Sequence, residues 1–99
     1  MSKVEVLHTD VVDAALAGGI DWQRHGDELV KTRRGKDFAD ALAYVNSVAE
    51  LAEEMDHHPD VDIRWNVVTL RLSTHSKGAI TALDLDLARR IDALPASGG

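Results

Sequence analysis

Several side chains that can carry protons fall within one short stretch of the sequence. Residues 53–59 read EEMDHHP, which places His57 and His58 side by side before Pro59, with Glu53 four residues before the first histidine. A further histidine, His75, follows in the segment LSTH. A histidine ring has an ordinary pKa of about 6.5, so it can accept or donate a proton near neutral pH. Histidine and carboxylate side chains are also ligands for zinc and iron. These residue types therefore point to acid–base catalysis or to metal binding.

Structural roles for the same residues stay open. Histidines at the end of a helix can complement the negative end of its dipole. Thr81 and Asp84 in TALD have the spacing of a capping box, which would use the carboxylate to begin a helix. Adjacent histidines rarely point the same way, and a helical pair spaced by four residues is missing, which weighs against a metal site. His8 and His25 have no such neighbours, and we interpret them as ordinary surface or strand residues.

The first third of the chain predicts a helix followed by a hairpin. Residues 9–19 fit a short helix with Thr9 as its N-cap and Gly18 and Gly19 at its end. Residues 20–34 then contain two short strand-like pieces on either side of a turn at residues 26–27. We expect Trp22 to anchor the first of these pieces in the core.

The remaining residues predict a long helix, a second hairpin and a last helix. Residues 36–56 carry apolar side chains at spacings of three and four. These are Phe38, Ala41, Leu42, Val45, Val48, Ala49, Ala52 and Met55. Residues 61–75 alternate, and their phase breaks at Asn66 and Val67, which indicates two strands. Their polar side would carry Thr69, Arg71, Ser73 and His75, and Trp65 would be a core or pocket residue. Residues 81–94 predict a helix with Leu83, Leu87, Ile91 and Leu94 buried.

This order predicts an α+β fold in one domain spanning residues 1–99. Hairpins favour antiparallel pairing, so the elements should form a four-stranded antiparallel sheet with about three helices on one face, in the order α-β-β-α-β-β-α. Residues 95–99 should form a frayed tail. Because the net charge is −6, we expect no direct binding of nucleic acid. The sequence has no cysteine and shows neither a signal peptide nor an apolar run of the roughly 20 residues that span a membrane. We therefore expect a cytoplasmic protein.

The spacing of the candidate residues resembles that of the pterin-4a-carbinolamine dehydratases. The matching positions are Glu53, His57, His58, Pro59, Trp65, Asn66, the segment LSTH at 72–75, and Asp84. The similarity runs from about Trp22 to Ile91 and includes an Asp-Phe pair at the start of the long helix. The pair of histidines before a proline is common by itself, and it is the joint spacing that carries the resemblance.

The resemblance implies an activity and an assembly. The activity is dehydration of 4a-hydroxytetrahydropterin to quinonoid dihydropterin, which recycles the pterin cofactor of aromatic amino acid hydroxylases and requires neither a metal nor an organic cofactor. The assembly would be a homodimer or homotetramer. Some relatives also bind other proteins, one of them as the dimerisation partner of a nuclear transcription factor. A non-catalytic interaction or assembly factor with the same fold is therefore the alternative.

The resemblance also implies roles for individual residues. His57 and His75 would transfer protons, and His58 would hold the pterin ring or the leaving hydroxyl. The residues implied in substrate binding are Glu53, Pro59, Ser73, Thr74 and Asp84. Glu53 would orient His57 or contact the pterin, and Asp84 would form a hydrogen bond near His75. Which histidine is the acid and which is the base is left open.

Overall fold

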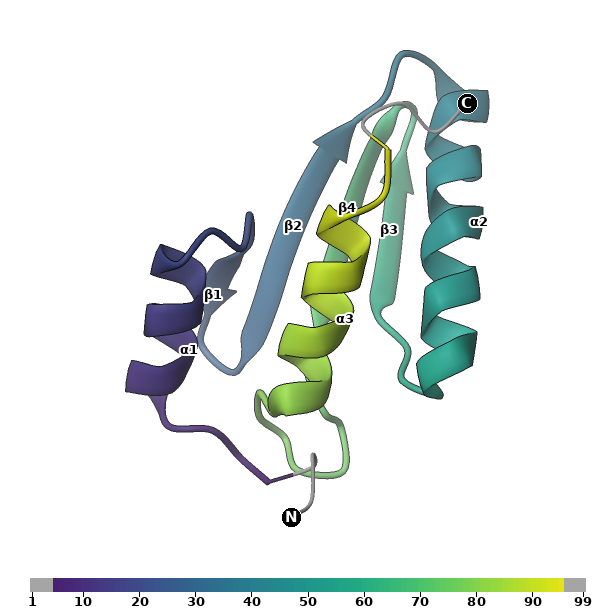
Figure 1. The fold of residues 1–99 in the computed structure, drawn as a ribbon. Coiled ribbons are helices and arrows are strands. Elements are labelled where there is room, and N and C mark those ends of the chain that lie inside the picture. The colour runs from purple at the N-terminus through teal and green to yellow at the C-terminus, as the bar shows by residue number, and fades with distance from the viewer. Residues whose placement is uncertain (1–4, 96–99) are drawn as a thin grey trace.

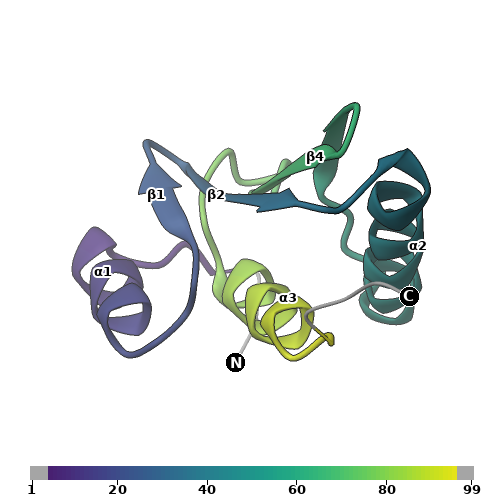
Figure 2. The same ribbon diagram turned by 90° about the horizontal axis from the view of Figure 1, so that it is seen from above.

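Three helices cover one face of a four-stranded antiparallel sheet in the computed structural model, which describes residues 5–95 (Figure 1). The elements are α1 (Thr9–Ala17), β1 (Gln23–His25), β2 (Glu28–Arg34), α2 (Phe38–Met55), β3 (Asp60–Arg64), β4 (Val67–Leu72) and α3 (Ala82–Asp92). The sheet has the order β1-β2-β4-β3. Seen from above, all three helices lie on the same side of the sheet (Figure 2). The predicted fold class and element order are confirmed.

The central strand β4 shows why the sheet is covered on one side. Val68, Leu70 and Leu72 are fully buried and belong to the core, whereas Thr69 and Arg71 alternate with them and reach solvent. An antiparallel sheet commonly packs one face and leaves the other hydrated. Leu87 and Ile91 of α3 complete the core. The polar side predicted for this strand is therefore confirmed.

The buried face of α2 differs from the predicted one. Ala41, Val48 and Ala52 are buried as expected, but Phe38 is 45% exposed and Leu42 is 40% exposed. Tyr44 was not predicted as a core residue and is buried, with the Arg33 guanidinium 4.4 Å from its ring centroid. A helix this rich in apolar residues offers two overlapping stripes with helical spacing, and contact with the sheet selects one of them. The second stripe is left on the surface.

Two further predictions are wrong. Thr9 does not cap α1, because the N-cap residue is His8, whose side chain makes no capping hydrogen bond. Trp65 is not a core or pocket residue, because its side chain is 66% exposed at the tip of the β3–β4 turn. Trp65 and Asn66 form the turn, one residue earlier than predicted, and Trp65 takes a left-handed backbone conformation with φ of 56°.

A cluster of partly buried charged side chains links the end of α3 to the sheet. The Asp92 carboxylate accepts hydrogen bonds from the Trp22 indole and the Lys31 ammonium, both at 2.9 Å, and Lys31 also reaches Asp21 at 3.2 Å. Burial of the Lys31 ammonium opposes its charged form, but the hydrogen bonds and attraction to these two carboxylates outweigh burial and raise its pKa. Trp22 is thus a core anchor, as predicted, and its indole N–H has a partly buried polar partner in Asp92.

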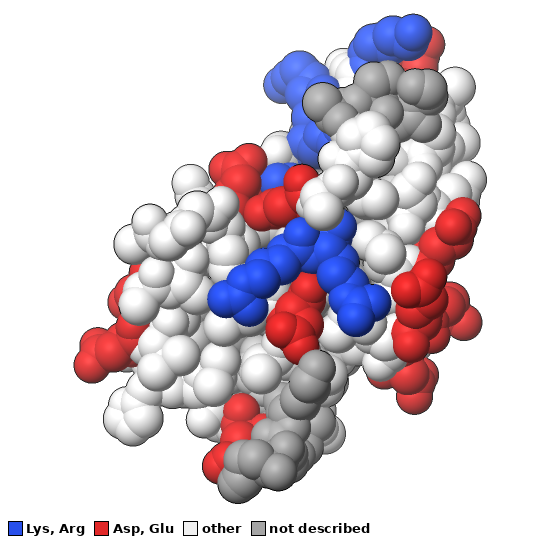
Figure 3. Space-filling view, in the orientation of Figure 1, with Lys and Arg blue, Asp and Glu red and all other residues white. Residues whose placement is uncertain are grey.

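Within residues 5–95, no helix is both long and apolar enough to cross a membrane. Small groups of acidic and basic side chains alternate over the face formed by the helices (Figure 3). Residues 96–99, most of the predicted tail, lie outside the described part of the chain.

Candidate functional site

The three candidate histidines lie around one hollow, where two elements end and a third begins. The end of α2, the end of β4 and the beginning of α3 lie at the same end of the molecule (Figure 1). A hollow of about 370 Å³ opens between them. Its lining consists of Asp56, His57, His58, Pro59, Asp60, Ser73, Thr74, His75, Ser76 and Leu83. The convergence that the sequence could only suggest is therefore present in the fold.

The backbone turn at the end of α2 gives the two adjacent histidines different burial. Asp56 ends the helix in a left-handed conformation with φ of 50°, which aspartate tolerates better than most residues. The His57 backbone N–H then donates to the Ala52 carbonyl at 3.0 Å. After this turn the His57 side chain is buried at 8% exposure, whereas the His58 side chain is exposed. A single local bend thus gives neighbouring residues separate environments.

His57 is held from behind by a buried carboxylate. Its Nε2 lies 2.6 Å from Oδ1 of Asp84, a residue with no exposed surface. The other oxygen, Oδ2, accepts the Thr74 hydroxyl at 3.0 Å and the Thr81 backbone N–H at 2.8 Å. Asp84 lies in the first turn of α3 and forms the predicted capping box with Thr81. The helix-start role and the site role of Asp84 therefore coexist in one side chain.

One pairing that the resemblance implied is different in the structure, and another is extended. Glu53 does not orient His57: its Oε2 lies 2.5 Å from Nε2 of His58, and both side chains are exposed. Asp84 does bond Thr74, the residue before His75, but its histidine partner is His57. The expected pairing of Glu53 with His57 fails because the chain leaves the helix at Asp56, so the i, i+4 relation no longer applies.

His75 also lines this hollow, and it lies in a tight turn that follows β4. Thr74 and Ala79 pair across the turn through the Thr74 N–H and the Ala79 carbonyl at 2.9 Å, and Gly78 has φ of +60°. The His75 side chain is 68% exposed, and its Nε2 lies 3.9 Å from Oδ2 of Asp60. His57 is thus enclosed and His75 is open to solvent.

The other predicted residues fall into two groups. Pro59 and Ser73 are half-buried and line the hollow. Thr74 lines it too, but its hydroxyl is directed to Asp84. Sequence reasoning missed Asp60 as a neighbour of His75 because strand register, which it did not assign, brings the beginning of β3 beside the end of β4. It also missed the Thr81 hydroxyl, although the capping box already marked that residue.

The hydrogen bonds of Asp84 define the state of the His57 ring. A carboxylate can only accept, so Nε2 of His57 must carry the hydrogen in this bond. In the neutral ring the second nitrogen, Nδ1, then has a lone pair and can accept a proton. Among residues 5–95, no three histidine, aspartate or glutamate side chains are grouped so that they could hold a metal ion. The arrangement is suited to moving protons at Nδ1 of His57 and at the His75 ring.

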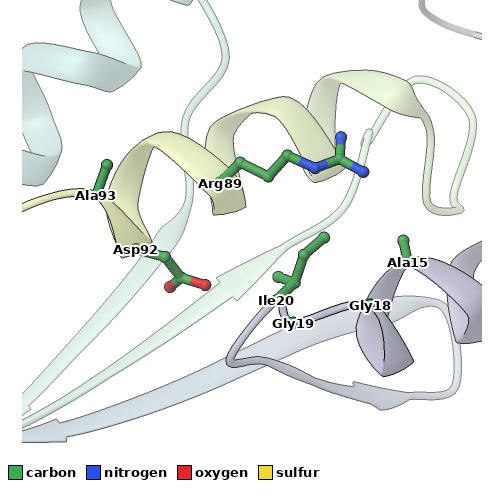
Figure 4. Close-up of a pocket in the computed structure, with 7 residues that line it drawn as sticks. All are labelled: Ala15, Gly18, Gly19, Ile20, Arg89, Asp92 and Ala93. Atoms are coloured by element: carbon green, nitrogen blue, oxygen red, sulfur yellow. The ribbon is translucent and has the colours of Figure 1, made fainter.

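A larger hollow, of about 490 Å³, lies between the end of α1 and the second half of α3 (Figure 4). Its charged lining residues are Arg89 and Asp92. Arg89 extends along this hollow toward Ala15, while Asp92 is already bound to Trp22 and Lys31. No histidine lines this hollow, so its size does not make it the better candidate for proton transfer.

Comparisons with known proteins agree with this geometry. A family model described as pterin 4 alpha carbinolamine dehydratase matches residues 5–94. A Nocardia farcinica protein, provisionally named a pterin-4-alpha-carbinolamine dehydratase, is 50% identical over 90 residues, which cover 91% of this chain and 95% of the relative. A Thermomicrobium roseum protein with the same provisional name is 56% identical over 70 residues, covering 71% of this chain and 75% of the relative.

Solved structures place the fold in the same group. The crystal structure of a transcriptional coactivator/pterin dehydratase from Brucella melitensis matches with a TM-score of 0.84 and 31% identity, covering 90% of this chain and 97% of the other. A pterin dehydratase-like RuBisCO assembly factor of the alpha-carboxysome shares the fold, with a TM-score of 0.59 and 23% identity over 73% of this chain and 83% of the other. With its histidine hollow and a family match over residues 5–94, the chain belongs to the pterin 4 alpha carbinolamine dehydratase family.

Proposed function

We propose that this protein dehydrates 4a-hydroxytetrahydropterin to quinonoid dihydropterin and so recycles the pterin cofactor of aromatic amino acid hydroxylases. The observation that supports this most is the pairing of a buried, oriented His57 with an open His75 in one hollow. The substrate must lose one proton from N5 and gain one at the hydroxyl on C4a. Two histidines in unlike surroundings can perform these two transfers.

The proposed chemistry assigns the base to His57. Nδ1 of the neutral ring accepts the proton from N5, and the electron pair left on nitrogen forms the N5–C4a double bond. The bond from C4a to the hydroxyl oxygen breaks, and protonated His75 delivers a proton so that water leaves. His75 is the better proton donor to the leaving group because its exposed ring can be recharged from solvent. General acid–base catalysis of this kind contributes roughly 10²–10⁴-fold to the rate.

The remaining lining residues serve substrate binding in this proposal. His58, fixed by Glu53, would contact the pterin ring at the open side of the hollow. Pro59 and Ser73 would contact the ring or its substituents from the wall. Asp84 would act on the substrate only through His57, because its side chain has no exposed surface.

A kinetic assay tests the proposal. Chemically generated 4a-hydroxytetrahydropterin is mixed with the purified protein, and formation of the quinonoid product is followed by absorbance against a buffer-only reaction. We expect a rate that exceeds the spontaneous rate and rises in proportion to protein concentration. A rate equal to that of buffer at every protein concentration would exclude the dehydratase function.

A second candidate function is protein interaction, and the exposed apolar residues of α2 and the sheet edge favour it. Phe38, Leu42, Val61 and Trp65 all have at least 40% of their surface exposed. Large exposed apolar groups of this kind are typical of interfaces.

We propose that a second copy of this chain covers part of this surface, giving a homodimer or homotetramer in which the unpaired edge of β3 is also protected. The Brucella melitensis protein is described as a coactivator, which suits a further protein partner. A cytoplasmic location is likewise part of this proposal.

A further inference from the structure

The Thr74 side chain is almost fully buried, and its hydroxyl is directed toward Asp84 and Thr81. Thr74 is 5% exposed, and its Oγ1 lies 3.0 Å from Oδ2 of Asp84. The same Oγ1 lies 2.7 Å from Oγ1 of Thr81, a residue with no exposed surface. The Thr81 oxygen in turn accepts the Leu83 backbone N–H at 3.2 Å. The two hydroxyls therefore join the end of β4 to the start of α3.

Donor and acceptor counting gives this chain of hydrogen bonds one direction. A hydroxyl has one hydrogen, and a carboxylate has none to give. Thr74 must donate to Asp84, so it accepts from Thr81, and Thr81 accepts from the Leu83 N–H. At the other oxygen Asp84 accepts from Nε2 of His57. In this chain of hydrogen bonds, each group's role as donor or acceptor is therefore fixed by the group next to it.

The helix cap alone does not require Thr74. The capping box needs only the Thr81 oxygen and the Asp84 carboxylate, both in or next to α3. Thr74 comes from a different segment and adds a second donor to the oxygen that the Thr81 N–H already contacts. With two donors on Oδ2, the carboxylate cannot rotate without losing them, so Oδ1 stays directed at His57.

We propose that Thr74 and Thr81 are positioning residues for the proton transfer at His57. They fix the Asp84 carboxylate, which holds the hydrogen of the His57 ring on Nε2 and keeps Nδ1 as the proton acceptor. This role rests on the proposed dehydratase function, and it replaces direct substrate binding as the role of the Thr74 hydroxyl. The Thr81 hydroxyl therefore has two roles: it caps α3, and it donates a hydrogen bond to the Thr74 hydroxyl.

The test replaces the Thr74 hydroxyl while keeping its shape. Thr74→Val removes the hydrogen bonds and Thr74→Ser retains them. Thr69→Val makes the same change on the outer face of the preceding strand, β4, where the Thr69 hydroxyl lies 3.5 Å from that of Thr32. Each variant is measured by dehydration kinetics and by nitrogen-15 NMR of the histidine rings above the pH of their titration. Thermal melting checks that each variant is folded. If the valine variant is unfolded, Thr74→Cys takes its place, because a thiol is a weak donor of similar size.

We expect Thr74→Val to lower kcat about tenfold with KM changed by less than about twofold, because an oriented base acts in the transition state rather than in binding. The NMR spectrum should show His57 with its hydrogen on Nε2 alone in the parent protein and a mixture of the two ring forms in Thr74→Val. Thr74→Ser and Thr69→Val should match the parent in both measurements.

Other results would overturn the role. A lower kcat with unchanged His57 ring signals would mean that Thr74 acts on the substrate itself. Unchanged kinetics and unchanged signals would mean that the hydroxyl does not position anything. If the parent protein has no dehydratase activity, the proposed function fails, and the NMR comparison still decides whether Thr74 controls the His57 ring.

Discussion

Replacing Asp84 with asparagine keeps the size of a fully buried side chain but changes the hydrogen bonds it can make. The carboxylate accepts three of them, from His57 Nε2, the Thr74 hydroxyl and the Thr81 N–H. An amide has one acceptor oxygen and an NH₂ group that only donates. If the amide oxygen keeps the Thr74 and Thr81 donors, the NH₂ group faces His57. Nε2 must then accept, and the ring hydrogen moves to Nδ1, which can no longer take a proton from the substrate.

The two effects of this change differ greatly in size. Loss of the proton acceptor removes general base catalysis, so we expect kcat to fall by at least about 10²-fold. Two of the three hydrogen bonds survive unchanged and the third reverses its direction, so the free energy of unfolding should fall by only about 1 kcal/mol. Asp84→Ala removes all three bonds and leaves buried donors unpaired, which should cost roughly 3 kcal/mol. For a domain of this size that loss lowers Tm by roughly 12–24 °C.

Dehydration kinetics and thermal melts followed by circular dichroism measure both effects. Asp10→Asn is the matched control, because Asp10 is an exposed carboxylate in the first turn of α1 and has the same relation to a helix dipole. We expect the control to keep full activity. Full activity in Asp84→Asn would mean that Asp84 acts only as a helix cap. An Asp84→Ala protein with the Tm of the parent would contradict the stabilising role of the buried hydrogen bonds.

The remaining predictions concern the histidines, metal, alkaline pH and assembly. His57→Ala and His75→Ala should each lower the dehydration rate by roughly 10²-fold or more. Tm should change little for the exposed His75 but fall for His57→Ala, which leaves Oδ1 of the buried Asp84 without its partner. His58→Ala should mainly raise KM, and equal KM effects in all three variants would contradict these roles. Exhaustive chelation should leave the rate unchanged, and a loss that zinc or iron restores would establish a metal site. Because the pKa of Lys31 is raised in the fold, its stabilising contribution is complete below its ordinary value of 10.5 and is lost as pH rises through the folded value. Chemical denaturation should show stability falling above that pH, less steeply in Lys31→Met, and identical slopes would refute the linkage. Light scattering at micromolar concentration should give a multiple of 10.8 kDa, reduced by Trp65→Ser, and a mass of 10.8 kDa in the parent would exclude the assembly.

The fold could be predicted because local signals agree with one another along most of the chain. Alternation in residues 61–75 and the turn at Gly26 identified the hairpins, and the spacing of Thr81 and Asp84 identified the start of α3. The sequence did not predict which of two apolar stripes on α2 is buried. On α2 both the stripe with Phe38 and the stripe with Tyr44 have helical spacing, and only packing against the sheet decides between them.

Most of the candidate residues lie around one hollow, but the sequence did not predict which of them contact one another. Sequence spacing suggested Glu53 with His57 because they are four residues apart, yet the left-handed conformation of Asp56 ends the helix before that relation holds. The contact between His57 and Asp84 joins residues 27 apart and depends on how α2 and α3 meet over the sheet. Such a tertiary pairing leaves no local pattern, whereas the cap that positions Asp84 does.

The central claim is that two histidines in one hollow dehydrate a 4a-hydroxypterin. The most direct measurement compares the parent protein with the double variant His57→Ala/His75→Ala at equal concentration, using chemically generated 4a-hydroxytetrahydropterin and subtracting the spontaneous reaction. We expect clear acceleration by the parent protein and a rate indistinguishable from buffer for a folded double variant. A double variant that still accelerates the reaction like the parent protein would contradict it.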